Sequence, residues 1–491
     1  MKIKYLLASL LATSLTFAWG CQPRDPEAPG EEPAAVDDRP TATIQGRLEA
    51  ELGPVANATM VVQRVEANGA LQNITIGDFR SDAQGNYEVT IDVTGGPLWD
   101  LIVEARGPQT APPTAEQPEG VEDVAAMRLG RVILVRQINE GDSVTVAPMD
   151  LETTLESDIY IQARSAGEWD DRCDTAVLRA VISPQLAAAV RMGEQYEQDV
   201  EALARATTGS MKAYVSTLMR DPGFEGQPQD QPALEGEPFN TFSENDMQNA
   251  RNELRNAIQD LDQRLHDTTE IEERMEAQRD FHTTLVEAYS NNNITIHQQA
   301  RATHASVEAA VVFMPVLASA AQASAMATAE YHRAFVVTRV IESNVDTLGV
   351  SGENLGSVEQ AGLSLKNTLL SYGGGQGDIS DQVNTAWANY RLAVETQLQV
   401  TLDETQRAAY AEMHDVVVQP RTQMFNVVEG LSPETSSTAA ANASSEAVPS
   451  YYNNVVSQQN ISSLEQADIS QDNARAILDT LFNFSVVTVE Q

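Results

Sequence analysis

The chain has 491 residues, and its formal net charge of −40 comes from 71 acidic residues against 31 lysines and arginines. This balance excludes nucleic acid as a partner, because nucleic-acid binding needs clustered cations that displace counterions from phosphates. It also disfavours binding to an anionic lipid surface, except through an attached lipid.

The first 20 residues have the layout of a secretory signal peptide. Two lysines precede "YLLASLLATSLTFA", an uncharged and mostly apolar run that ends before Gly20. This run is shorter than the roughly twenty residues that a helix needs to cross a bilayer. We therefore predict that residues 1–20 direct export and are then removed.

Cys21 follows the small residues Ala18 and Gly20 in "FAWGC". This motif resembles the lipobox of bacterial lipoproteins, in which the cysteine is thioether-linked to diacylglycerol and becomes the mature N-terminus. The resemblance implies a lipidated Cys21 that attaches the protein to a membrane, and Gln22 as the next residue implies the outer membrane. An anchor with more than one acyl chain holds a protein stably. Ordinary secretion with a free thiol is the alternative.

Residues 21–40 contain "QPRDPEAPGEEPAAVDDRP", which has no apolar periodicity. Proline and charge keep such a segment extended and unfolded. We predict an acidic tether between the lipid and the first folded domain.

Residues 41–150 predict a small β-sandwich with additional strands. Runs such as "TATIQGRLEA" and "GNYEVTIDV" are short, rich in β-branched residues and separated by glycine-containing turns. Strands spaced about ten residues apart are typical of a sandwich. "RVILVRQI" and "DSVTVAPM" predict two further strands after a proline-rich loop.

Four segments within residues 41–108 are similar to the carboxypeptidase-regulatory-like, or transthyretin-like, domain. They are "IQGRL", "GPVANATMVV", "FRSDAQGNYEV" and "LIVEARG". The resemblance implies a spacer, packing platform or adhesive module without an active site. Asp82 in the third segment is expected to brace its own turn rather than to bind a metal ion.

Residues 151–491 predict a large, elongated, mostly α-helical bundle with loops at 221–243, 372–378 and 432–450. Ser183 and Pro184 are typical of the start of a helix, which we expect to bend or break near Gly209. We predict long helices over about 183–219, 243–289, 295–344 and 380–429, and shorter helices near 355–371 and 470–483.

Residues 309–329 carry no charge and are long enough to span hydrocarbon. Alanine and serine dominate the stretch, and a helix with small residues all round suits the packed centre of a bundle. We predict a buried central helix kinked at Pro315, with membrane insertion as the alternative.

The sequence contains no pattern from which we assign a catalytic residue, metal ligand or cofactor. Cys173 stands among three aspartates, which oppose a thiolate, so we interpret it as a half-buried apolar residue. The histidines form neither HExxH nor a Glu-x-x-His pair, although His297 and His304 lie on one helical face. The six are His266, His282, His297, His304, His332 and His414.

These features together predict a lipid-anchored, non-enzymatic protein of the cell envelope whose helical domain presents a surface to a protein or glycan partner. One alternative is a small-ligand binder or enzyme whose site is assembled from distant residues. A membrane-perturbing protein that uses residues 309–329 is the other. A buried polar pocket with convergent His or Glu side chains would favour a ligand site.

Overall fold

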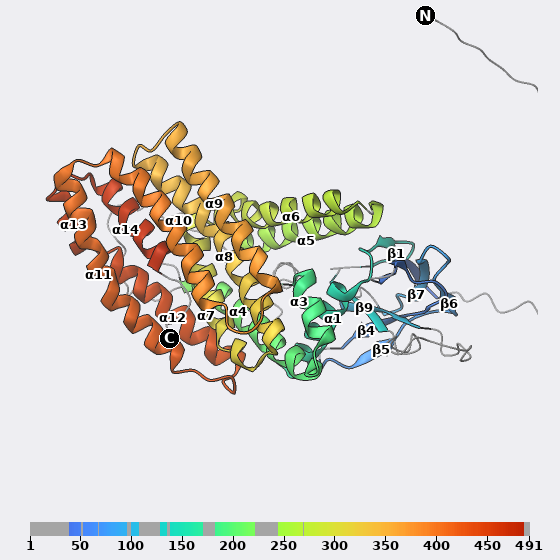
Figure 1. Ribbon diagram of the computed structural model, residues 1–491. Helices are drawn as coiled ribbons and strands as arrows, with labels where there is room; N and C mark the ends of the chain where they lie inside the picture. The colour runs from blue at the N-terminus through green and yellow to red at the C-terminus, as the bar shows by residue number, and fades with distance from the viewer. Residues whose placement is uncertain are drawn as a thin grey trace, which may run out of the picture. The chain divides into compact units, whose positions relative to one another are not determined.

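A computed structural model describes residues 39–50, 53–66, 68–95, 100–107, 128–134, 138–169, 182–220, 244–268 and 270–485. The predicted signal peptide, Cys21 and nearly all of the tether lie outside these residues, as do Cys173 and the loop at 221–243. Residues from Pro40 onward belong to one compact unit. In that unit a β-sheet region is followed by a mostly helical region, as the sequence predicted (Figure 1).

Two sheets enclose the first hydrophobic core. One has the strand order β10-β1-β7, with β1 parallel to β10, and the other has the order β5-β4-β8-β9, with β6 also paired to β4. Ile44, Val62, Val89 and Val103 are among the fully buried residues of this core. The strands are β1 (Thr41–Arg47), β2 (Glu49–Ala50), β3 (Gly53–Pro54), β4 (Thr59–Val65), β5 (Leu71–Asn73), β6 (Phe79–Arg80), β7 (Asn86–Asp92), β8 (Asp100–Arg106), β9 (Arg128–Leu134) and β10 (Ser143–Thr145).

Strand β8 is buried on both faces, which makes its sheet a central layer. Leu101 and Val103 belong to the core between the sheets. Ile102 belongs to a second core with Ile159 of helix α1 (Leu151–Ser165). Successive side chains of a strand point to opposite faces, so this alternation joins the sheets to the helical region.

The helical region begins with α1, which contacts β9. Its helices pack through three further hydrophobic clusters. The remaining elements are α3 (Pro184–Met192), α4 (Tyr196–Arg220), α5 (Glu244–Asp267), α6 (Ile271–Asn291), α7 (Ile296–Val311), η2 (Met314–Val316), α8 (Ser319–Thr347), α9 (Glu353–Ser371), η3 (Tyr372–Gly374), α10 (Ser380–Thr401), α11 (Glu404–Glu429), α12 (Ser437–Val455), α13 (Gln458–Glu465) and α14 (Gln471–Ser485).

The start of α3 is confirmed, but the predicted break at Gly209 is wrong. Ser183 Oγ accepts a hydrogen bond from the backbone of Leu186, and Pro184 occupies the first helical position. The chain breaks at Gly193 instead, and α4 runs through Gly209 without interruption. A Cβ built on Gly209 would lie 3.5 Å from Phe313, so this glycine serves close helix packing.

The other three predicted long helices are also each divided in two. The 243–289 segment becomes α5 and α6, which lie side by side (Figure 1), and Leu261 and Phe281 belong to the hydrophobic cluster that they share. The 380–429 segment breaks after α10, where Asp403 caps the first turn of α11. The 295–344 segment breaks between α7 and α8. Packing of apolar stripes against a neighbouring helix favours these breaks, which the periodicity alone does not reveal.

The uncharged stretch 309–329 is not one helix. It includes the end of α7, the η2 turn and the start of α8, and Pro315 lies within the turn. Ala321 and Ala325 are buried in the bundle, whereas Pro315 and Val316 in the turn are exposed, so the predicted burial holds for only part of the stretch. Among the described residues no helix combines the length and apolarity needed to span a membrane.

The loop predicted at 432–450 is largely helical. Residues 437–455 form α12, which begins after the N-cap Ser436 and contains Pro449. Ala440, Ala441 and Ser444 are fully or almost fully buried, and α12 contacts α4 and α7. Small side chains let these helices approach closely, and this burial outweighs the weak helix propensity of serine and proline. The 372–378 segment remains a loop apart from the short η3 turn.

Gly69, in the turn between β4 and β5, tests the contact between the sheet region and α1. It has φ of +78°, and a Cβ there would lie 2.6 Å from Ser165 Oγ and 2.8 Å from its backbone nitrogen. We expect Gly69→Ala to lower the free energy of unfolding by about 1–2 kcal/mol through φ strain and a further 1–3 kcal/mol through overpacking.

Gly95→Ala is the matched control, because Gly95 has φ of +98° but no heavy atom of the described residues within 4 Å of its Cβ position. Urea unfolding monitored by circular dichroism measures both variants. Equal losses of stability would show that the contact with Ser165 does not contribute to the free energy of unfolding.

Candidate functional site

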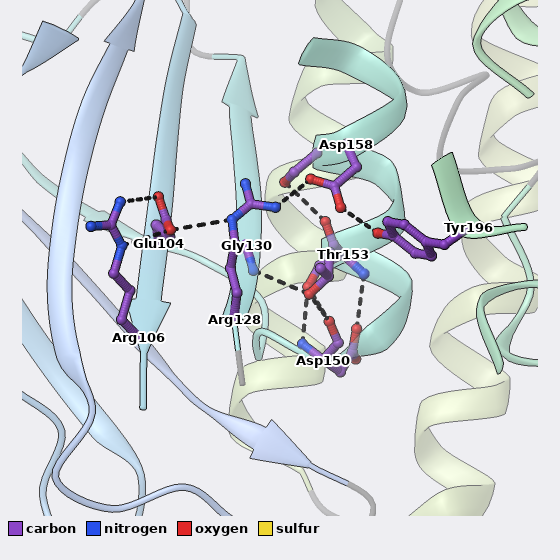
Figure 2. Close-up of polar contacts among 10 residues, drawn as sticks. Glu104, Arg106, Arg128, Gly130, Asp150, Thr153, Asp158 and Tyr196 are labelled. Atoms are coloured by element: carbon purple, nitrogen blue, oxygen red, sulfur yellow. Dashed lines mark hydrogen bonds and ion pairs between the residues drawn. The ribbon is translucent and has the colours of Figure 1, made fainter. Parts of the chain in front are cut away.

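Helix α1 is fixed on the sheet by its first turn. Asp150 accepts a hydrogen bond from the backbone of Thr153 at 3.0 Å, and the Thr153 side chain accepts from the backbone of Asp150 at 2.9 Å (Figure 2). Thr154 Oγ1 accepts from the backbone of Gly130 in β9 at 3.1 Å. A Cβ built on Gly130 would lie 3.4 Å from Ser157 Cβ, so α1 leaves little room for a larger side chain at this position.

A chain of ionic contacts extends from β8 to α4. Figure 2 shows Arg106 and Arg128 donating to Glu104, at 2.8 and 3.2 Å, and Arg128 also donating to Asp158 at 2.5 Å. The hydroxyl of Tyr196 donates to the other oxygen of Asp158. Burial opposes ionisation of Glu104, but the two arginines overcome it and lower the pKa of this carboxyl group.

A second contact is deeply buried and joins β9, α1 and α5. Arg131 donates to Glu156 at 2.8 Å and to both oxygens of Asp262 at 2.9 and 3.0 Å. All three side chains are buried. One guanidinium faces two carboxyl groups here, so burial raises the pKa of Glu156 to about 7 against the opposing effect of Arg131.

Beside this contact lies a cavity of about 520 Å³, which we name the junction cavity. Its acidic residues are Asp150, Glu152 and Glu156, all at the start of α1. Its apolar wall includes Leu261 of α5, Phe281 of α6 and Tyr331 of α8. Cavities of this size that combine apolar walls with a few convergent polar groups are typical ligand sites.

Two histidines lie close together at the edge of the junction cavity. The rings of His282 on α6 and His332 on α8 have centroids 6.3 Å apart, and His282 lines the cavity. Burial lowers their pKa values to about 3 and about 4, so both rings are neutral at physiological pH. The buried Nδ1 of each makes no hydrogen bond with the described residues.

Another buried charge cluster lies inside the bundle. Arg333 on α8 is fully buried, binds Glu330 on the same helix and lies 3.5 Å from Glu308 of α7. Trp387 of α10 donates to Glu330 at 3.0 Å. Burial raises the pKa of Glu308 to about 7. These contacts join three helices, and we interpret the cluster as structural.

The structure accounts for the residues that the sequence singled out within the described ranges. His297 and His304 both face α14, where their rings lie 2.9 Å from Asp479 Oδ2 and 3.1 Å from Asn483 Oδ1. In the part of the chain that the structure describes, no three His, Cys, Asp or Glu residues are placed to hold a metal ion. The sequence did not reveal the junction cavity, since its lining residues lie between 147 and 370.

The raised pKa of Glu156 makes a prediction about stability and pH. The ordinary pKa of 4.5 describes the unfolded chain, and the folded value is about 7. The folded state therefore binds the proton more tightly, and this contribution to stability is present below pH 4.5 and is lost as pH rises towards 7. Glu156→Gln mimics the protonated form. We expect it to reduce the loss of unfolding free energy between pH 4.5 and pH 7 by about 1–3 kcal/mol.

Urea unfolding at a series of pH values measures the effect. Glu412→Gln is the control, because Glu412 is exposed on α11. Stability curves of wild type and Glu156→Gln that stay parallel across this range would contradict the assignment.

Comparisons of this chain with protein-family models, with curated proteins and with solved structures find no match.

Proposed function

We propose that this protein is a lipid-anchored, non-enzymatic binding protein of the cell envelope that holds a small molecule in the junction cavity. The cavity is the observation that carries the proposal. Carboxylates, aromatic rings and a neutral imidazole converge on a volume of about 520 Å³. Polar groups placed in this way orient a ligand, and the apolar walls supply most of the contact area.

The β-sheet region acts in this proposal as a transthyretin-like packing platform. Asp82 Oδ1 accepts hydrogen bonds from the backbone of Gln84 and Asn86, both at 2.8 Å, which supports its expected role in bracing a turn. Arg131 connects this region to α1 and α5, two of the helices that line the cavity. The platform thereby fixes the positions of the lining residues.

The anchor is proposed from the sequence. The motif "FAWGC" supports lipidation of Cys21, and Gln22 supports the outer membrane as the location. Two acyl chains or more make such attachment stable.

A protein or glycan partner is a second candidate for the helical region. Leu392 and Val400 of α10 are 65% and 68% exposed, and Val418 of α11 is 54% exposed. Apolar side chains exposed to this degree favour a protein partner over a glycan.

The anchor is tested by Cys21→Ser. Without the thiol no thioether forms, so we expect the protein to leave the membrane fraction and to remain unprocessed or appear in the soluble fraction. Fractionation with immunoblotting, together with mass spectrometry of the mature N-terminus, measures this. An unchanged membrane fraction would contradict the anchor.

The ligand is tested by Asn367→Trp. Asn367 is exposed on α9 and lines the junction cavity, so an indole ring there should occupy its volume without disturbing the core. Native mass spectrometry of protein released from its own membranes should show an added small-molecule mass that Asn367→Trp lacks. Asn389→Trp, at an exposed position of α10, should keep it. The same mass on all three proteins, or on none, would contradict a ligand in this cavity.

A further inference from the structure

The charges around the junction cavity indicate which class of ligand it accepts. Three acidic residues line it from the start of α1, whereas Arg279, exposed on α6, is the cationic side chain among the described lining residues. The charge of Arg131 is already shared between Glu156 and Asp262. The described lining residues therefore carry more acidic than cationic groups.

Phosphates and carboxylates are poor candidates for this cavity. Anions bind where cations cluster or where a helix N-terminus offers free N–H groups. Here the first turn of α1 is capped by Asp150, whose carboxylate takes the place in which an anion would bind. Glu152 adds a second negative charge in the same turn.

The opposite wall suits an apolar or aromatic group. Phe281 and Tyr331 line it, and the ring of His282 stands edge-on to Tyr331, with centroids 5.6 Å apart and an interplanar angle of 89°. Aromatic faces attract cations as well as apolar surface. The uncharged imidazole of His282 adds no positive charge, and its Nδ1 makes no hydrogen bond with the described residues.

We propose that the junction cavity binds an organic cation, a protonated amine carried on an apolar or aromatic body. The ammonium group lies against the carboxylates of α1, and the body lies between the aromatic side chains of α6 and α8. This assignment deepens the proposed binding function and rests on it.

Three naphthalene compounds test the charge preference with one ring system. They are naphthalenemethylammonium, naphthalenemethanol and naphthoate, titrated calorimetrically into the full-length protein in detergent at physiological ionic strength. We expect the ammonium compound to bind roughly tenfold or more tightly than the alcohol, and naphthoate to bind most weakly, since an ionic contact in a partly buried site is worth about 1.4 kcal/mol or more.

Glu152→Gln tests the site. Glu152 is half-buried in the first turn of α1 and is not one of the two carboxylates that bind Arg131. We expect a roughly tenfold loss of affinity for the ammonium compound and no change for the alcohol, which also verifies that the cavity is intact. Glu412→Gln should leave both affinities unchanged, and Asn367→Trp should abolish binding of both.

Three outcomes would overturn the proposal. Equal binding of the three compounds, or tightest binding of naphthoate, would exclude a preference for cations while leaving a ligand site in place. Binding of none would exclude this ligand class, and the bound mass sought by native mass spectrometry would then decide separately whether the cavity holds another ligand. Ammonium binding that survives both Glu152→Gln and Asn367→Trp would place the site elsewhere.

Discussion

The buried guanidinium of Arg131 is the constraint on which the contact of the β-sheet region with helices α1 and α5 depends. It is the point where a strand and two helices, separated by up to 131 positions along the chain, share one set of hydrogen bonds. Burying charge is costly, and a buried ion pair adds little net stability compared with apolar packing. Its value lies in direction, because the planar guanidinium holds Glu156 through Nη1 and Asp262 through Nη2, two donors whose relative orientation is fixed. Glu156 binds Arg131 and also lines the cavity, so the same contact that places α1 places part of the cavity wall.

The networks around Glu104 and Arg131 differ in their exposure to solvent and therefore in how they respond to pH. Arg106 and Arg128 are partly exposed and fully compensate Glu104, whose pKa is lowered. Arg131 is only 2% exposed and faces two carboxyl groups, and burial raises the pKa of both. The outer network holds α1 and α4 on the sheet, and the contribution of Glu104 to stability is lost only as pH falls through its lowered pKa. The inner network couples the packing of α5 to the protonation of Glu156.

The sequence predicted features that depend on neighbouring residues and missed those that depend on distant ones. The Ser183 N-cap and the Asp82 turn were predictable, because each side chain bonds to backbone within four residues. The turn between α5 and α6 was not, since apolar residues continue at intervals of three and four across it. Only packing of the two halves against each other, where Leu261 and Phe281 share a hydrophobic cluster, distinguishes one helix from two. Residues 437–455 have the composition of a loop, and burial against other helices makes them a helix.

The sequence did not reveal the junction cavity for a related reason, which concerns its acidic residues. In a chain with 71 acidic residues, nothing local separates Glu156, which is buried, from Glu412, which is exposed. The large net charge does not select a ligand either, because salt screens exposed charges beyond about 10 Å. Carboxylates in a partly buried wall are screened far less and act over short distances. The proposed selectivity for a cation therefore depends on the few acids that α1 carries to the cavity, and these are placed by a strand that contributes none of the described lining residues.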